Sequence, residues 1–481
     1  MFATYSASLR PHSIFGHQKT NERFVKTIST LGENFGKSIP VSASNKREKE
    51  SIYHFMNSPR VTAENILLAE RDRVLKKIND DQTSSTFFAI GDVTVLSFTT
   101  TNRGSAKIGL LGGKKHPGYN VLTQLMCDSN GVSIGLLGQN YWNYEESELG
   151  QRKSRQHLPI DQKETGYYFD QFQQLENLFK DQPKSRIVFM FDRAGDVHEI
   201  LQARKSAHIH FLIRSKSNRK LQDTDLTIRE FLDQIEPCGC YSLEIQASKI
   251  KNPNFLEAKK QKKQVHGEVD RTANLTVKFS KVTIRASNIR ANRPLKPVEL
   301  YVVRAQELNP PEGVEPVDWV LLTSLPVENF EDALQIIQYY GHRWQIEVFH
   351  NILKQGAQIE KLQFEEPVGT QNAIAIYSLI SAQILLLRAA FDKSPEANIE
   401  KFGYSQNDYN VIATYLNARN ELTLDSDKES IKISEFAYLI SILGGNHNRA
   451  SIGAKSLWQG LKDFRILKDA YNLFYKSPNS A

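Results

Sequence analysis

Two aspartates in this sequence stand where an unpaired carboxylate is costly. Asp92 lies inside the apolar run Thr86–Phe98, and Asp192 ends the apolar run Arg186–Asp192. Both runs predict buried strands, where a carboxylate must be paired, protonated or bound to a cation. Taken alone, each aspartate is better explained by a structural role, such as capping a helix or serving the turn that follows Asp192.

Glu347 is a third carboxylate, and together with the two aspartates it indicates metal chemistry. Carboxylate oxygens are the ligands that suit Mg²⁺ or Mn²⁺. Two such ions about 3.5–4 Å apart can activate an attacking oxygen and stabilise the leaving oxygen of a phosphodiester. Asp92, Asp192 and Glu347 therefore predict a site for phosphodiester cleavage or strand transfer.

The stretch around Glu347 predicts one helix from Tyr339 to Lys354, because it lacks proline and is rich in helix formers. At about 100° per residue, Tyr340, Arg343, Glu347 and Lys354 fall within roughly a 60° arc. Its two cations could neutralise phosphate oxygens, and its tyrosine could hydrogen-bond one. The alternative is a solvated helix with an Arg343–Glu347 ion pair, worth only about 0.3–0.5 kcal/mol.

The surrounding segments predict a mixed α/β sheet, because apolar β-branched runs alternate with helical patterns after an initial meander. The expected strands are Thr86–Phe98, Ile108–Leu111, Val121–Met126, Val132–Gln139, Arg186–Asp192, Ile209–Arg214, Leu275–Arg285, Val298–Arg304 and Trp319–Thr323. Helices are expected at Tyr168–Asp181 and Asp196–Ala203, and beyond about Ala373 the chain reads as helical to its end. Residues from about 224 to 317 have strand-like patterns and a basic composition, which indicates an inserted β domain.

Charge is concentrated near the start of the chain and in one loop. The first 75 or so residues predict basic helices at Asn21–Leu31, Lys46–Met56 and from an N-cap at Thr62 to about Ile78. Lys249–Lys263 is a lysine-rich loop. The net charge of +7 and the pI near 9.0 are compatible with a polyanionic partner. The N-terminal helices fit a DNA-binding surface and an ordinary soluble surface equally well.

The remaining composition indicates a soluble protein of a reducing compartment. The three cysteines give no disulfide framework. The most apolar segment, Ala373–Leu387, is predicted to be too short and too polar to span a bilayer, and so to form a buried helix. No secretory leader is recognisable, so we expect a cytoplasmic location.

Several motifs, in order along nearly the whole chain, resemble one family. Tyr340, Arg343, Glu347 and Lys354 fit the Y-x-x-R-x-x-x-E-x-x-x-x-x-x-K signature of bacterial DDE transposases of the cut-and-paste, hairpin-forming branch, which are encoded by insertion sequences. Further segments that resemble the family are Tyr53–Val61, Ala89–Ser97, Asp192–His198, Phe211–Lys220, Trp319–Pro326, Leu443–Gly445 and Ser456–Gly460.

This resemblance implies a ribonuclease-H-like catalytic domain over residues 79–390, with the β insertion at about 224–317. It also implies an N-terminal helical DNA-end-binding domain over residues 1–78. A C-terminal helical domain over residues 391–481 would pair two protomers on DNA. The family's endonuclease reaction is a hydrolytic nick at the transposon end that leaves a 3′-OH. That hydroxyl attacks the opposite strand to form a hairpin, which is reopened before strand transfer into target DNA.

The resemblance also implies roles for individual residues. Asp92, Asp192 and Glu347 would be catalytic metal ligands for Mg²⁺, for which Mn²⁺ can substitute. The expected DNA contacts are Tyr340, Arg343, Lys354, Arg214, Lys216, Trp319 and Trp344. Trp319 matches an aromatic residue that stacks on a flipped base, although core packing in a strand would also explain it. The implied partners are the element's inverted-repeat ends, target DNA and a second protomer in the synaptic complex.

Three positions depart from the family pattern. Asn351 replaces a common cation, Ala194 replaces a common glutamate, and Asn120 replaces a common histidine. None of these changes removes a predicted metal ligand, so they do not exclude catalysis. They are compatible with a reduced catalytic activity. The alternatives are a catalytically weak DNA-binding protein derived from a transposase, and a ribonuclease-H-fold nuclease without strand transfer.

Overall fold

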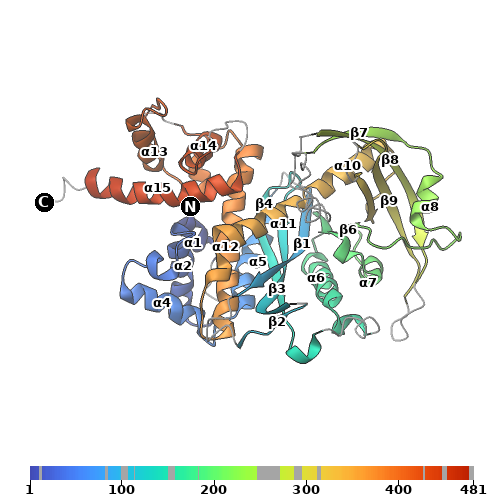
Figure 1. Cartoon of the computed structure of the whole chain (residues 1–481), viewed down its shortest axis with the longest axis horizontal. Helices are drawn as coiled ribbons and strands as arrows, with labels where there is room; N and C mark the ends of the chain where they lie inside the picture. Colours follow the sequence, from blue (N-terminus) through green and yellow to red (C-terminus); the bar gives the residue numbers. More distant parts are fainter. Residues whose placement is uncertain are drawn as a thin grey trace, which may run out of the picture. The chain divides into compact units, whose positions relative to one another are not determined.

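The computed structural model describes residues 1–9, 14–81, 85–98, 107–112, 114–149, 158–182, 184–245, 271–286, 295–310, 316–425, 428, 430–446 and 452–475. The chain divides into two compact units, and Figure 1 labels most of their elements. Unit 1 combines Met1–Phe189 with His342–Ala481, and unit 2 is Met190–Gly341. The predicted basic loop Lys249–Lys263 lies outside the described residues.

The strands of unit 1 include the predicted antiparallel meander. They are β1 (Thr86–Ser97), β2 (Leu110–Leu111), β3 (Lys114–Cys127), β4 (Ser133–Trp142) and the start of β5 (Arg186–Phe191). The longer strands follow the order β4-β3-β1-β5. This order, with β3 and β4 on one side of β1 and β5 on the other, agrees with the ribonuclease-H-like core that the resemblance implied. The predicted mixed α/β fold is therefore confirmed.

Helices make up the rest of unit 1. Those longer than one turn are α1 (Phe2–Ser8), α2 (Gln18–Glu33), α4 (Lys46–Met56), α5 (Ala63–Asp80), α6 (Glu164–Phe179), α11 (Trp344–Asn351), α12 (Pro367–Lys393), α13 (Gln406–Ala418), α14 (Ile433–Leu443) and α15 (Ala454–Tyr475). The predicted N-cap of α5 is confirmed, because the Thr62 hydroxyl accepts a hydrogen bond from the Asn65 amide at 3.2 Å.

Helix α12 is longer than the apolar segment predicted from the sequence. It spans 27 residues, because the polar residues that flank Ala373–Leu387 remain helical. By length and composition it could cross a membrane, but 83% of its most apolar window is buried inside the structure. It packs against α2, α4, α5, α14 and β4 of unit 1, as expected of a core helix.

Glu70 of α5 is fully buried and joins three elements of unit 1. It accepts hydrogen bonds from the Tyr5 hydroxyl at 2.9 Å, from Arg73 at 2.7 and 2.8 Å, and from the Leu136 amide at 3.3 Å. Arg73 in turn donates to the Ile134 carbonyl at 2.6 Å. Burial, followed by the charge of Glu70, raises the pKa of Tyr5. The Glu70–Arg73 pair thereby satisfies backbone groups of β4 and ties α1 and α5 to this strand.

Unit 2 continues from β5 with a mainly antiparallel set of strands. They are β6 (Ile209–Arg214), β7 (Gly239–Ile245), β8 (Arg271–Ile284), β9 (Val298–Glu307) and β10 (Asp318–Thr323), in the order β5-β6-β10-β9-β8-β7. Its helices are α7 (His198–Gln202), α8 (Ile228–Asp233) and α10 (Phe330–Gly341), and α10 packs on β8 and β9. The predicted β-rich segment is thus present as β7, β8 and β9, while the predicted domain boundaries stay a prediction.

Candidate active site

The helix predicted from Tyr339 to Lys354 is broken in the structure, so that prediction is wrong. Helix α10 ends at Gly341, α11 begins at Trp344, and a π-helical turn follows at Ile352–Gly356. Glycine is a poor helix former, and the His342 ring leaves the helical path to pack against Phe88 at a centroid distance of 5.4 Å. The predicted 60° arc therefore does not describe this segment.

Asp92 nevertheless meets part of that segment within unit 1. It lies on β1 and its side chain is 22% exposed. Its Oδ1 accepts a hydrogen bond from the Val93 amide at 2.8 Å, and its Oδ2 lies 3.8 Å from Nη1 of Arg343. Nη2 of the same guanidinium donates to Oε1 of Glu347. Two predicted metal ligands thus converge on one cation.

The Arg343–Glu347 ion pair that the solvated-helix alternative predicted is present, but Arg343 has a further contact. Arg343 and Glu347 form the expected i,i+4 pair, but Arg343 also faces Asp92, and its side chain is only 17% exposed. Asp92 and Glu347 supply the oxygen donors that a divalent cation prefers, and the guanidinium balances their negative charge here. The pair fits a divalent metal. In the described part of the chain, no group of three or more His, Cys, Asp or Glu is arranged to hold one.

Lys354 and Asn351 differ in their surroundings. Nζ of Lys354 donates to the Val95 carbonyl of β1 at 2.9 Å, which anchors the π-helical turn on the same strand as Asp92. Asn351 ends α11 and is exposed. Because Lys354 is held by a neutral carbonyl, its charge is not neutralised by this contact.

His350 supplies no positive charge beside this cluster. Burial lowers its pKa to about 3, and the positive charges of Lys354 and Arg343 act in the same direction. The ring is therefore neutral at physiological pH and serves as part of the core beneath α11.

Asp192 belongs to unit 2, where it begins the turn Arg193–Gly195. Its Oδ1 accepts a hydrogen bond from the Ala194 amide at 2.8 Å, as the structural alternative expected. Within the described residues its Oδ2 has no hydrogen-bond partner, and the residue is half-exposed. The cap therefore occupies one carboxylate oxygen and leaves the other available to a cation.

Asp196 organises the loop that carries Lys216, a role that the sequence did not reveal. Its carboxylate is buried, forms an ion pair with Arg219 at 2.6 Å, and accepts hydrogen bonds from the amides of Lys216 and Ser217 at 2.7 and 3.0 Å. The Lys216 side chain is exposed. The matching motif segments contained both Asp196 and Arg219, but no spacing rule indicated that they pair.

The other predicted DNA contacts range from buried to exposed. Tyr340 is only 6% exposed, and its ring packs edge-on against Trp319 at a centroid distance of 6.2 Å in unit 2. Trp319 is half-buried, so packing accounts for part of its surface. Arg214 is half-buried and donates to the Asp318 carbonyl at 3.4 Å. Trp344, in unit 1, is 60% exposed.

A known family matches the part of the chain that contains two of the three predicted metal ligands. Residues 168–382 match the family model described as the transposase DDE domain. The matched span includes Asp192 and Glu347, and the match supports the predicted DNA transposase function. DDE transposases generally use divalent metal ions.

A solved structure similar to this chain is the cryo-EM structure of a piggyBac transposase synaptic complex with hairpin DNA. The identity is 12% and the TM-score is 0.35, over 88% of this chain and 73% of that one. A likeness at this level carries no inference about the fold or the site. The predicted bacterial, Y-R-E-K branch stays a prediction.

Proposed function

We propose that this protein is a DNA transposase that cleaves the ends of its own element and joins them to target DNA. The observation that carries the proposal is the convergence of Asp92 and Glu347 on Arg343, in a chain that matches the transposase DDE domain. A solvated ion pair would account for Glu347 but not for a β1 aspartate at the same guanidinium.

The proposed mechanism assigns the chemistry to three carboxylates. Asp92, Asp192 and Glu347 would hold Mg²⁺, or Mn²⁺ in its place, and the bound metal would activate the attacking oxygen and stabilise the leaving one. Arg343 would then be released from the carboxylates to bind phosphate oxygens. A nick at the element's end would leave a 3′-OH, whose attack on the opposite strand would form a hairpin before strand transfer.

A search for short inverted repeats that flank the gene, followed by a cleavage assay on them, tests this function. We expect nicks and hairpins that require Mg²⁺ or Mn²⁺ and disappear with a chelator. Nicks without hairpins would indicate a nuclease without strand transfer. Binding of the repeats without any cleavage would indicate a transposase-derived DNA-binding protein. Either result would overturn the proposal.

We also expect the protein in the bacterial cytosol, associated with the nucleoid.

The proposed DNA contacts are Tyr340, Arg343, Lys354, Arg214, Lys216, Trp319 and Trp344. Lys216 and Trp344 are the most accessible of these, because both are exposed without rearrangement. Buried Tyr340 would act by supporting Trp319. Lys354 would have to exchange the Val95 carbonyl for a phosphate oxygen, a favourable exchange because an anion is the better partner of an ammonium group.

A basic pocket on the N-terminal helices supports DNA binding in unit 1. The pocket has a volume of about 220 Å³ and is lined by His17, Lys19, Thr20, Arg23, His54, Ser58, Pro59 and Arg60. None of these residues is acidic. In the described part of the chain, the side chains of Lys19, Arg23 and Arg60 form no ion pair or hydrogen bond. Cations without counter-charges are suited to phosphate oxygens.

Replacing Lys19, Arg23 and Arg60 together with glutamine is expected to weaken DNA binding about 10- to 100-fold at 0.15 M salt. The slope of log affinity against log salt should fall by about 1 for each phosphate group that the variant no longer neutralises. Fluorescence anisotropy with an end duplex, without divalent cations, measures both. The matched control replaces Lys76, Lys455 and Lys462, which are also exposed, with glutamine. An equal loss of affinity in the control would mean that net charge, and not this pocket, is responsible.

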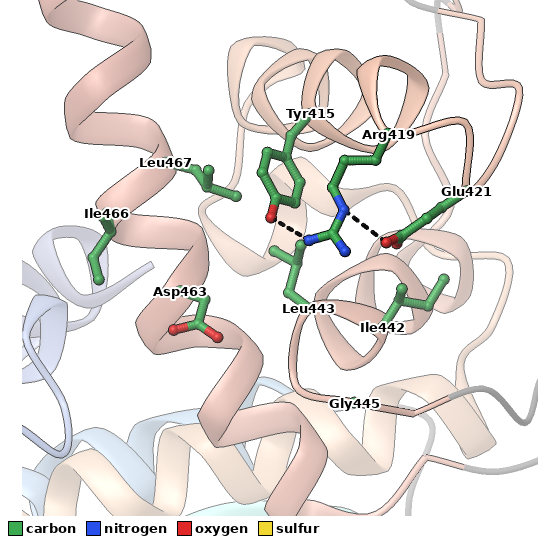
Figure 2. A pocket seen from close by; sticks show the side chains of 9 residues that line it. All are labelled: Tyr415, Arg419, Glu421, Ile442, Leu443, Gly445, Asp463, Ile466 and Leu467. Atoms are coloured by element: carbon green, nitrogen blue, oxygen red, sulfur yellow. Dashed lines mark hydrogen bonds and ion pairs between the residues drawn. The ribbon is translucent and has the colours of Figure 1, made fainter.

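Helix α15 supports the proposed homodimer. Ile466, Leu473 and Phe474 are 53%, 69% and 79% exposed, an unusual exposure for large apolar side chains. Ile466 is among the residues that line a cavity of about 400 Å³. Figure 2 shows Arg419, which also lines it, between its partners Tyr415 and Glu421. A cavity of this size can accommodate an aromatic side chain from a second protomer.

Replacing Phe474 with Asp is expected to reduce assembly of a complex with two protomers and two DNA ends at least about 10-fold, because an aspartate cannot be buried in an apolar interface without a partner. Light scattering coupled to size-exclusion chromatography measures the mass of the complex. Lys462→Asp, at another exposed position of α15, is the control. Undiminished assembly by the Phe474 variant would rule out this helix face as the dimer contact.

A further inference from the structure

A row of polar side chains crosses three strands of unit 1 and ends at Asp92. Asp92 of β1 pairs directly with Thr123 of β3, and Thr123 pairs directly with Gln139 of β4. Directly paired residues of antiparallel strands carry their side chains on the same face, with Cβ atoms about 4.5–5.5 Å apart. Tyr141, two residues along β4 from Gln139, lies on this face as well.

Along this row each side chain donates a hydrogen bond to the next, from Tyr141 to Gln139 and from Gln139 to Thr123. The Tyr141 hydroxyl donates to Oε1 of Gln139 at 2.6 Å. Because Oε1 is the acceptor, the amide nitrogen of Gln139 faces the other way, and Nε2 donates to the Thr123 hydroxyl at 2.9 Å and to the Ser378 hydroxyl of α12 at 3.0 Å. Tyr141 therefore fixes the orientation of Gln139, and Gln139 fixes the role of Thr123 as an acceptor.

Thr123 still has a proton to donate. Its hydroxyl oxygen accepts from Gln139, its own O–H donates no hydrogen bond within the described part of the chain, and the residue is fully buried from water. The side chain directly opposite on β1 is the Asp92 carboxylate. An O–H donated to a carboxylate is a strong hydrogen bond and fixes the carboxylate's orientation.

We propose that Thr123 is a positioning residue that holds the Asp92 carboxylate for metal binding, within a chain that runs from Tyr141 through Gln139. This inference rests on the proposed function, because it takes Asp92 as a metal ligand. Hydrogen-bond partners of metal ligands commonly contribute 10- to 100-fold to metal affinity or activity. The Val93 amide donates to Oδ1 of Asp92, so a hydroxyl donated by Thr123 on metal binding would add a side-chain contact that sets the plane of the group.

Replacing Thr123 with valine keeps the shape of the side chain and removes the hydroxyl. Gln139 retains Ser378 as an acceptor, so we expect the strand pairing to persist. The variant should bind Mn²⁺ about 10- to 100-fold more weakly than the wild type, and its cleavage should recover at high Mg²⁺. Thr123→Ser keeps the hydroxyl and should behave as the wild type. Thr123→Ala, which cannot overfill the site, should show the same loss of affinity as valine.

Electron paramagnetic resonance of free Mn²⁺, titrated with the full chain in the absence of DNA, gives a readout that is independent of cleavage. Thr94→Val is the matched control, because Thr94 is a buried threonine two residues from Asp92 on the same face of β1. Weaker Mn²⁺ binding in Thr123→Val and Thr123→Ala, with normal binding in Thr123→Ser and Thr94→Val, supports the inference. An equal loss of affinity in Thr94→Val would overturn it.

Asp92→Asn separates this inference from the proposed function. If Asp92→Asn weakens Mn²⁺ binding while neither Thr123→Val nor Thr123→Ala does, Asp92 remains a ligand and the positioning role of Thr123 is rejected. If Asp92→Asn also binds Mn²⁺ as the wild type does, Asp92 is not a ligand, and both the inference and the proposed function fail.

Discussion

Replacing Asp192 with Asn is expected to reduce cleavage of the element's DNA end at least about 1,000-fold, because a neutral amide oxygen binds a divalent metal more weakly than a carboxylate and does not balance its charge. Asparagine retains a side-chain oxygen for the Ala194 amide and is itself a favourable cap, so the turn after β5 should remain folded. The loss should therefore be one of chemistry. Gel analysis of cleaved ends measures it, and DNA binding by the same variant should stay close to that of the wild type.

The matched control for this variant is Asp223→Asn, which removes one exposed carboxylate from the same unit. It should cleave at the wild-type rate. Asp92→Asn and Glu347→Gln should share the loss of cleavage shown by the Asp192 variant, because the three carboxylates are proposed to act as a unit. Unchanged cleavage by all three amide variants would end the catalytic assignment.

The second large effect concerns stability. Glu70→Ala is expected to lower the free energy of unfolding by about 3–5 kcal/mol, because it leaves Arg73, whose side chain is only 15% exposed, without its carboxylate partner. The variant also removes the acceptor of the Tyr5 hydroxyl and of the Leu136 amide. Urea unfolding monitored by circular dichroism gives the difference in free energy, provided that unit 1 unfolds in a single transition.

Asp72→Ala is the control for Glu70→Ala. Asp72 lies two residues further along α5, is exposed, and should change stability by less than about 0.5 kcal/mol. A Glu70 variant as stable as this control would show that the β4 edge does not depend on the Glu70–Arg73 pair.

Local patterns predicted the strands well, because apolar β-branched runs are buried whatever their neighbours. β1, β5 and β6 lie where those runs predicted them. The break at Gly341 was not predicted, because one glycine is tolerated in many helices and the competing contact is made by Phe88, far away in the sequence. The π-helical turn at Ile352–Gly356 is likewise set by long-range anchoring, here of Lys354 to Val95.

In the candidate site, too, local patterns predicted some features, and contacts between distant parts of the sequence determine the others. The residue types and apolar surroundings of Asp92 and Asp192, taken together with Glu347, indicated a cation, and the resemblance implied the same three residues as metal ligands. The contact of Arg343 with Asp92 could not be derived from spacing, because a sequence pattern carries no information on which strand a helix packs against. The pairs Glu70–Arg73 and Asp196–Arg219, each with a buried carboxylate, were not predicted for a related reason. In a sequence, a charged residue that will be buried cannot be told from one that will be solvated.

The central claim is that Asp92 and Asp192 hold the catalytic metal, and the most direct test changes which metal ion these positions bind. Asp92→Cys and Asp192→Cys replace a hard oxygen with a soft thiolate, which binds Mg²⁺ poorly and binds Cd²⁺ or Mn²⁺ better. We predict that both variants fail to cleave an end duplex in Mg²⁺ and regain cleavage when Mn²⁺ or Cd²⁺ is supplied, while the wild type cleaves in Mg²⁺. Cleavage at the wild-type rate in Mg²⁺ by both cysteine variants would contradict the proposal that these aspartates hold the catalytic metal.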